Sequence, residues 1–120
     1  MERVRRSDGE TNRDLAGLPV MLTLSAANPT YQMKASDNVV IAVSSQADAA
    51  SIITLPSLAE AVGQFYLISA PTGSTAGDIS IYEKETGSEL STYGDLDADD
   101  DHVLLMSDGT QWRVILDGVA

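Results

Sequence analysis

Short apolar runs, separated by clusters of turn-forming residues, fill the chain from Leu18 onward. Several runs are rich in Val and Ile, and residues 78–83 alternate between apolar and polar side chains, as a β-strand does. We expect strands at residues 18–24, 31–34, 38–44, 51–55, 64–70, 78–83, 88–93, 102–106 and 111–116. Turn signals recur roughly every 8–12 residues, and this spacing predicts an all-β fold: a small β-sandwich, a jelly roll or a β-barrel-like domain.

One segment departs from the β pattern. Pro56 suits the first position of a helix, and Leu58 and Val62 stand four residues apart, on one helical face. Gly63 follows as a typical C-terminal stop. We therefore expect one short helical turn over residues 56–62.

The clearest local signal is a hairpin around residue 108. Two apolar runs, at residues 102–106 and 111–116, flank the pair Asp108-Gly109. An Asp-Gly pair supplies the positive φ angles that a tight hairpin turn needs. We expect the two runs to pair as antiparallel strands.

The first residues differ from the rest in composition. Residues 1–14 contain only Met1 and Val4 as apolar residues and cannot form a core alone. We predict an extended N-terminal arm over residues 1–17, either disordered or ordered on a neighbouring subunit, and a single β domain over residues 18–120. The arm holds four of the seven basic residues, which are Arg3, Arg5, Arg6 and Arg13. Four acidic residues offset them.

The charge of the chain excludes several partners. The net charge is -11, and because the arm is neutral it falls entirely on the rest of the chain. Such a body repels nucleic acid and anionic membranes, so we expect neither as a partner. No apolar stretch reaches the roughly 18 residues of a membrane helix, and no signal-peptide core is present, so we expect a soluble protein without an export signal. The absence of cysteine excludes disulfides and thiolate metal sites.

Residues 95–101 form an acidic run that resembles the start of a calcium loop. A helix-loop-helix calcium loop needs Gly at its sixth position and Glu at its twelfth, where this chain has Asp100 and Met106. We therefore predict a solvated loop and no metal site. A looser oxygen cage for a hard cation stays open as the alternative.

The chain offers little for catalysis. His102 is the only histidine, and it lacks the Ser, Cys or further His partners that a triad or a zinc site would need. We predict no catalytic residues, no cofactor and no enzymatic activity. Trp112 could serve as a ligand platform, but we favour a core anchor because large aromatic side chains dominate core burial.

A set of strand ends carries a family resemblance. A strand over residues 52–56 ends in Leu-Pro, a short turn leads to Gly63, an Ile-x-Ile strand lies at residues 79–82, and an Asp-Gly hairpin closes on Trp112. This pattern, over residues 38–116, resembles a β-module of tailed-bacteriophage virion proteins. The module occurs in tail fibres, tail spikes and capsid decoration (cement) proteins.

The resemblance implies a function. A short chain with a polar arm is most similar to a capsid decoration protein, which implies a homotrimer on the outer capsid surface. Its partners would be the major capsid protein and itself, with the arm arginines Arg3, Arg5, Arg6 and Arg13 contacting the shell. The alternative is a tail-fibre or receptor-binding module that recognises a host surface ligand.

Overall fold

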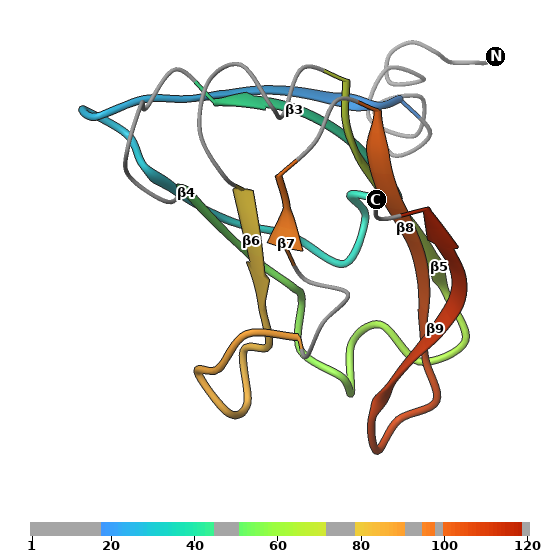
Figure 1. Ribbon diagram of the computed structural model, residues 1–120. Helices are drawn as coiled ribbons and strands as arrows, with labels where there is room; N and C mark the ends of the chain where they lie inside the picture. The colour runs from blue at the N-terminus through green and yellow to red at the C-terminus, as the bar shows by residue number, and fades with distance from the viewer. Residues whose placement is uncertain (1–17, 45–50, 72–78, 91–94, 98–99, 119–120) are drawn as a thin grey trace, which may run out of the picture.

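The chain folds into two β-sheets. The computed structural model describes residues 18–44, 51–71, 79–90, 95–97 and 100–118 (Figure 1). Within these residues there are nine strands and no helix, which confirms the all-β prediction. The strands are β1 (Val20–Leu24), β2 (Thr30–Gln32), β3 (Val39–Ser44), β4 (Ser51–Thr54), β5 (Phe65–Ala70), β6 (Ile79–Tyr82), β7 (Asp95–Leu96), β8 (Asp101–Ser107) and β9 (Trp112–Gly118).

The first six strands alternate between the two sheets. One sheet has the order β1-β3-β5-β8-β9 and the other the order β2-β4-β6-β7. Every second strand therefore returns to the same sheet. In this way β1, β3 and β5 pair in parallel in one sheet, and β2, β4 and β6 pair in parallel in the other. Jelly rolls are antiparallel throughout. The finer jelly-roll, sandwich or barrel-like class is therefore not confirmed.

Antiparallel strands complete both sheets. β7 pairs with β6, and the hairpin β8–β9 adds to β5 along its full length. Figure 1 shows this hairpin in red at one side of the molecule. The hairpin prediction is confirmed, but the loop spans the four residues between Ser107 and Trp112, with positive φ at Gly109 and not at Asp108.

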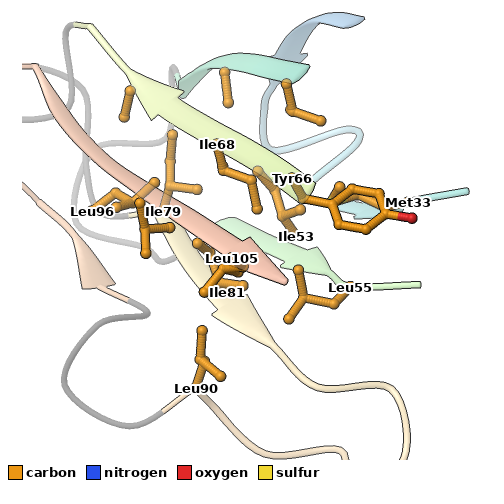
Figure 2. Close-up of a cluster of buried hydrophobic side chains, with 14 of the residues drawn as sticks. Met33, Ile53, Leu55, Tyr66, Ile68, Ile79, Ile81, Leu90, Leu96 and Leu105 are labelled. Carbon is orange, nitrogen blue, oxygen red and sulfur yellow. The ribbon is translucent and has the colours of Figure 1, made fainter. Parts of the chain in front are cut away.

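The hydrophobic core lies between the two sheets. In β5 the buried positions are Tyr66, Ile68 and Ala70, and the residues between them point outward. The four-stranded sheet supplies Ile53 and Ile81 to the same cluster. Figure 2 shows these side chains converging from both sheets. One continuous core therefore joins the sheets.

We expected a short helical turn over residues 56–62, but this segment forms a turn and not a helix. The Ala61 N–H donates to Ser57 O at 3.1 Å, and the Glu60 N–H donates to Ser57 Oγ at 3.2 Å, but this single turn does not continue. Gly63 has a φ of 76°, and its N–H donates to Ser107 O of β8. The turn does not continue into a helix because the backbone N–H of Gly63, which follows it, bonds to β8.

Other expectations shift or fall outside the described residues. The strand expected at residues 88–93 is reduced, in its described part, to a bridge between Tyr82 and Glu89. The arm at residues 1–17, with its four arginines, lies outside the described residues. No helix in the described part is long and apolar enough to cross a membrane.

Candidate docking face

The five-stranded sheet has a second apolar surface on the side away from the core. Because side chains alternate along a strand, the outward positions of paired strands lie side by side; β1, β3, β5 and β8 pair in unbroken register, and β9 joins them with one bulge between Leu104 and Leu105 of β8. We call this surface the outer face; it consists of Met21, Thr23, Val39, Ile41, Val43, Phe65, Leu67, Ser69, His102, Leu104, Met106, Arg113 and Leu116.

The outer face is apolar across all five strands. Val39, Leu67, Leu104 and Leu116 form one cross-strand row through four of them. Met21 at the β1 edge is 72% exposed, and Leu116 at the β9 edge is 52% exposed. The four-stranded sheet covers only the opposite side, because all core residues of β5 and β8 point there.

The outer face also lacks negative charge. None of its residues is Asp or Glu, although the chain carries a net charge of -11. Its polar members are Thr23, Ser69, His102 and Arg113. Solvated surfaces of acidic proteins are normally studded with carboxylates, so an acid-free sheet face marks a surface with another use.

The size of the outer face fits an interaction surface. Five strands about 4.8 Å apart and about 20 Å long cover on the order of 500 Å². The largest apolar patch on a typical monomer measures about 300–600 Å² and is often functional. The outer face stands at the upper part of that range and offers somewhat less than one side of a standard-size protein interface.

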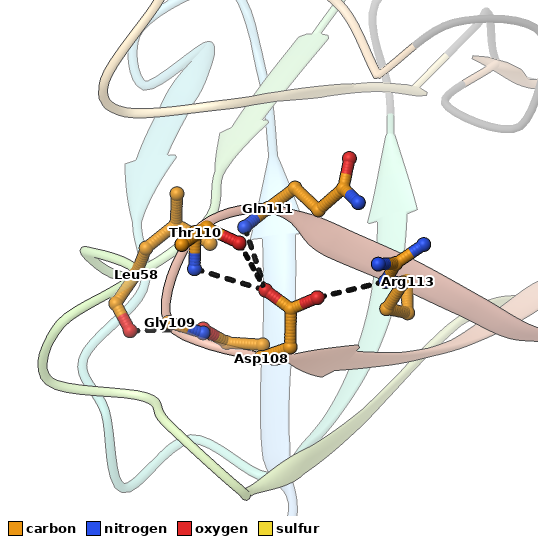
Figure 3. A network of polar contacts seen from close by, with 7 residues as sticks. Leu58, Asp108, Gly109, Thr110, Gln111 and Arg113 are labelled. Carbon is orange, nitrogen blue, oxygen red and sulfur yellow. Dashed lines mark hydrogen bonds and ion pairs between the residues drawn. The ribbon is translucent and has the colours of Figure 1, made fainter.

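The β8–β9 loop is held rigidly beside the outer face. Asp108 Oδ1 accepts hydrogen bonds from the N–H groups of Thr110 and Gln111, each at 2.9 Å, and from Thr110 Oγ1 at 2.8 Å. Its Oδ2 accepts from Arg113 Nε at 2.8 Å (Figure 3). These donors hold the pKa of Asp108 well below its usual range. The ion pair also fixes the guanidinium of Arg113, the one strong cation of the outer face.

A second set of bonds ties this loop to the turn after β4. Ser107 Oγ donates to Leu58 O at 2.8 Å and accepts from the Gly109 N–H at 3.2 Å. Figure 3 shows Leu58 beside the hairpin loop. The rim of the outer face is therefore built on packed backbone, which lowers the ordering cost of binding.

His102 has a local structural role. Its Nδ1 lies 2.9 Å from Asp100 O, and its ring lies so close to Gly118 of β9 that a Cβ there would collide with it. The two residues are cross-strand partners. This arrangement agrees with the interpretation of His102 as a structural residue and requires glycine at position 118.

Trp112 is a core anchor, as predicted. It is 8% exposed and meets Tyr66 edge to face, with ring centroids 5.6 Å apart and planes at 76°. Its Nε1 is buried without a hydrogen-bond partner among the described residues. The ring therefore offers no platform for a ligand.

The acidic run is only partly solvated. Asp97 and Asp100 are exposed, but Asp101 is 1% exposed and its Oδ2 accepts from the Asp97 N–H at 3.1 Å. Leu96 is buried in the core. The prediction of a solvated loop is thus wrong for Asp101, because this residue belongs to β8. No group of three or more His, Cys, Asp or Glu side chains in the described residues is placed to hold a metal ion.

A buried carboxylate lies at the other end of the core. Asp37 is 7% exposed, and its Oδ2 accepts from Tyr31 Oη and from the Lys34 N–H, both at 2.8 Å. Burial, together with the hydrogen bond and the charge of Asp37, raises the pKa of Tyr31 to about 12. This pair closes the turn between β2 and β3.

Known proteins do not supply a name for this arrangement. Comparisons with protein-family models, with curated proteins and with solved structures found no match.

The outer face was missed by the sequence reasoning, although a signal for it exists. β3 reads Val-Val-Ile-Ala-Val before its last residue, Ser44, and the middle of β8 reads Val-Leu-Leu-Met. Continuous apolar runs are typical of strands that are buried on both faces. In the described part of the chain, the other sheet covers only one of those faces.

Proposed function

We propose that the chain is a virion structural protein, a capsid decoration protein that binds the outer surface of an assembled phage head and stabilises contacts between major capsid proteins. The observation that supports this proposal is the outer face: a rigid, acid-free apolar surface on an otherwise strongly acidic protein. It is suited to docking on a protein surface, while the remaining carboxylates stay hydrated.

The energetics of such docking favour a repetitive shell. Burying the outer face, about 500 Å² of mostly apolar surface, contributes at most on the order of 12 kcal/mol. Association costs about 4–15 kcal/mol in lost freedom. A single face therefore binds with modest affinity, and a second contact from the same molecule would add avidity. We propose that the N-terminal arm, with Arg3, Arg5, Arg6 and Arg13, supplies that second contact.

Stabilisation of the shell follows from preferential binding. A protein that binds the assembled lattice and not free capsid subunits shifts the equilibrium toward the lattice. The homotrimer that the resemblance implies would multiply the contacts. Its subunit number stays a prediction.

The test is co-sedimentation of the purified protein with undecorated heads of tailed phages. We expect saturable binding by the full chain, and weaker binding by a chain lacking residues 1–14. Leu67→Gln/Leu104→Gln, which makes the centre of the outer face polar, should reduce binding at least tenfold. Lys84→Gln, on an exposed turn of the other sheet, is the control and should bind as the unchanged protein does.

The result also separates the alternatives. Binding that survives the Leu67→Gln/Leu104→Gln change would remove the outer face from the interface. Absence of binding by the full chain to every head would reject the decoration role and turn attention to receptor binding at the tail.

A further inference from the structure

The two sheets share one open end. β1 is the edge of the five-stranded sheet and β2 the edge of the four-stranded sheet, and the chain passes directly from one to the other. All later parallel strands add on the far side of this pair. The end of the molecule formed by β1 and β2 therefore presents the edge strands of both sheets.

The other two edges are protected against pairing. β7 has only two residues. β9 is bulged opposite Leu104 and Leu105 and carries Arg113 and Asp117. Short strands, bulges and charges are the devices by which proteins block edge-to-edge contact.

The β1 edge has none of these devices. Its residues Val20, Met21, Leu22 and Thr23 carry no charge and pair with β3 in unbroken register. An uncharged, regular, apolar edge is a template for another strand.

The core is also incompletely covered at this end. Val20 and Leu22 of β1 and Tyr31 of β2 are only partly buried, while Val40 and Ile53 on the neighbouring strands are fully buried. Stacked strand units normally end in a capping unit with a polar outer surface. Here β1, which ends the five-stranded sheet, is apolar except for Thr23, while β2, which ends the other sheet, exposes the polar residues Thr30 and Gln32.

We propose that a second copy of this chain stacks head to head on the open end, with β1 pairing antiparallel to its symmetry mate around Leu22. A two-fold axis places identical rows beside one another, so an uncharged strand meets no like charge. The pairing covers Val20 and Leu22 of both copies and joins the two outer faces into one wide surface. This inference does not depend on the capsid role.

Among the described residues, no strand pairs with the free side of β1. Outside the described residues, the only large apolar or aromatic residues are Met1, Val4, Leu15, Tyr93 and Val119. They are scattered over three separate segments of the sequence, so no segment outside the described residues has an apolar sequence like that of β1. A second copy supplies that strand in full.

The expected association is weak. The open end measures roughly 10 Å across the two sheets and about 17 Å along β1, far less than the area of a standard interface. We therefore expect monomers at a few micromolar and dimers approaching millimolar concentration.

Sedimentation equilibrium of the full chain from about 10 μM to 1 mM tests the proposal. The average mass should rise from 12.7 kDa toward twice that value. Met21→Lys/Thr23→Lys places two charges on the β1 edge without touching the core and should hold the protein monomeric. Ile115→Lys/Leu116→Lys places the same charges on the β9 edge and should leave the association unchanged. Circular dichroism checks that both variants are folded.

Three outcomes would overturn the proposal. The first is that the unchanged protein remains a monomer at 1 mM. The second is that both double variants lose association equally, which would assign the self-association to the outer face. A mass of three chains would replace the two-fold arrangement by a trimer. A trimer would agree with the homotrimer that the resemblance implies, and loss in both variants would assign self-association to the face proposed to dock on phage heads; head binding itself is tested separately by co-sedimentation.

Discussion

The same substitution, Leu→Ala, should have different effects at two neighbouring leucines of β8: one variant should mainly lose stability and the other should mainly lose binding to phage heads. Leu105 faces the core, is fully buried and lies between Tyr66 and Val114 in the strand register. Leu104 faces outward, between Leu67 and Leu116. Leu→Ala at either position removes the same atoms, so the difference between the two variants measures only what covers each side chain.

The magnitudes follow from burial. Leu105→Ala leaves a cavity in a packed core and should cost about 3 kcal/mol, within the usual range of about 2–5 kcal/mol. This is a large share of a total stability of roughly 5–15 kcal/mol, and it corresponds to a melting temperature lower by about 10–15 °C. Leu104 is only partly buried, by its neighbours on the outer face, so Leu104→Ala leaves no closed cavity and should cost about 1 kcal/mol, clearly less than Leu105→Ala.

Urea unfolding followed by Trp112 fluorescence measures both values. The protein should be studied at a few micromolar, where the inferred self-association is weakest, and equal m-values would show that the unfolded states match. Binding to phage heads should show the reverse order, with Leu104→Ala weakened and Leu105→Ala, while folded, unaffected. Equal destabilisation by the two variants would refute the reasoning, because Leu104 would then be covered within the isolated chain.

Three further predictions concern local interactions. Asp108→Asn should lower the urea midpoint at pH 7 and much less at pH 2. Because the folded-state pKa of Asp108 is lowered, the carboxylate contributes its full stability above the unfolded-state pKa of 3.8, and this contribution is lost progressively as pH falls from 3.8 toward the folded-state value. Absorbance at 295 nm should show Tyr31 ionising near pH 12, and because its folded-state pKa is raised, stability should fall as pH rises from 10 to 12. Gly118→Val should destabilise the β8–β9 pair by collision with the ring of His102.

Each of these has its own control. Asp117→Asn removes a carboxylate from β9 and should not reproduce the pH dependence of Asp108→Asn. Tyr31→Phe should abolish the late ionisation, and its persistence would assign it to another tyrosine. His102→Ala should partly rescue Gly118→Val by making room for the added side chain, and failure to rescue would contradict the steric explanation.

The strands could be predicted from the sequence because their signals are local. β-Branched runs bounded by turn residues place eight of the nine strands near their observed bounds, and Asp108-Gly109 marks the hairpin. The partners of these strands could not be predicted. Val20 pairs with Val40 across an intervening strand of the other sheet, and no local pattern encodes that crossing.

The candidate site was harder to predict than the fold. Asp101 looks like part of a solvated charge run, and only the position of β8 shows that it is buried. The outer face depends on which side of each strand meets the other sheet, and the continuous apolar run Val39 to Val43 of β3 does not reveal that side. A helical period at Leu58 and Val62 likewise did not produce a helix, because the turn bonds to Ser107 of β8 instead.

Methionine oxidation tests the docking role of the outer face most directly. Met106 lies on the outer face, whereas Met33 is 2% exposed in the core and serves as the internal reference. Mild peroxide treatment with and without bound phage heads, followed by mass spectrometry, compares the two rates. Docking through the outer face predicts that bound heads slow the oxidation of Met106 severalfold and leave the rate at Met33 unchanged. Oxidation of Met106 at the same rate in the bound and free protein would contradict it.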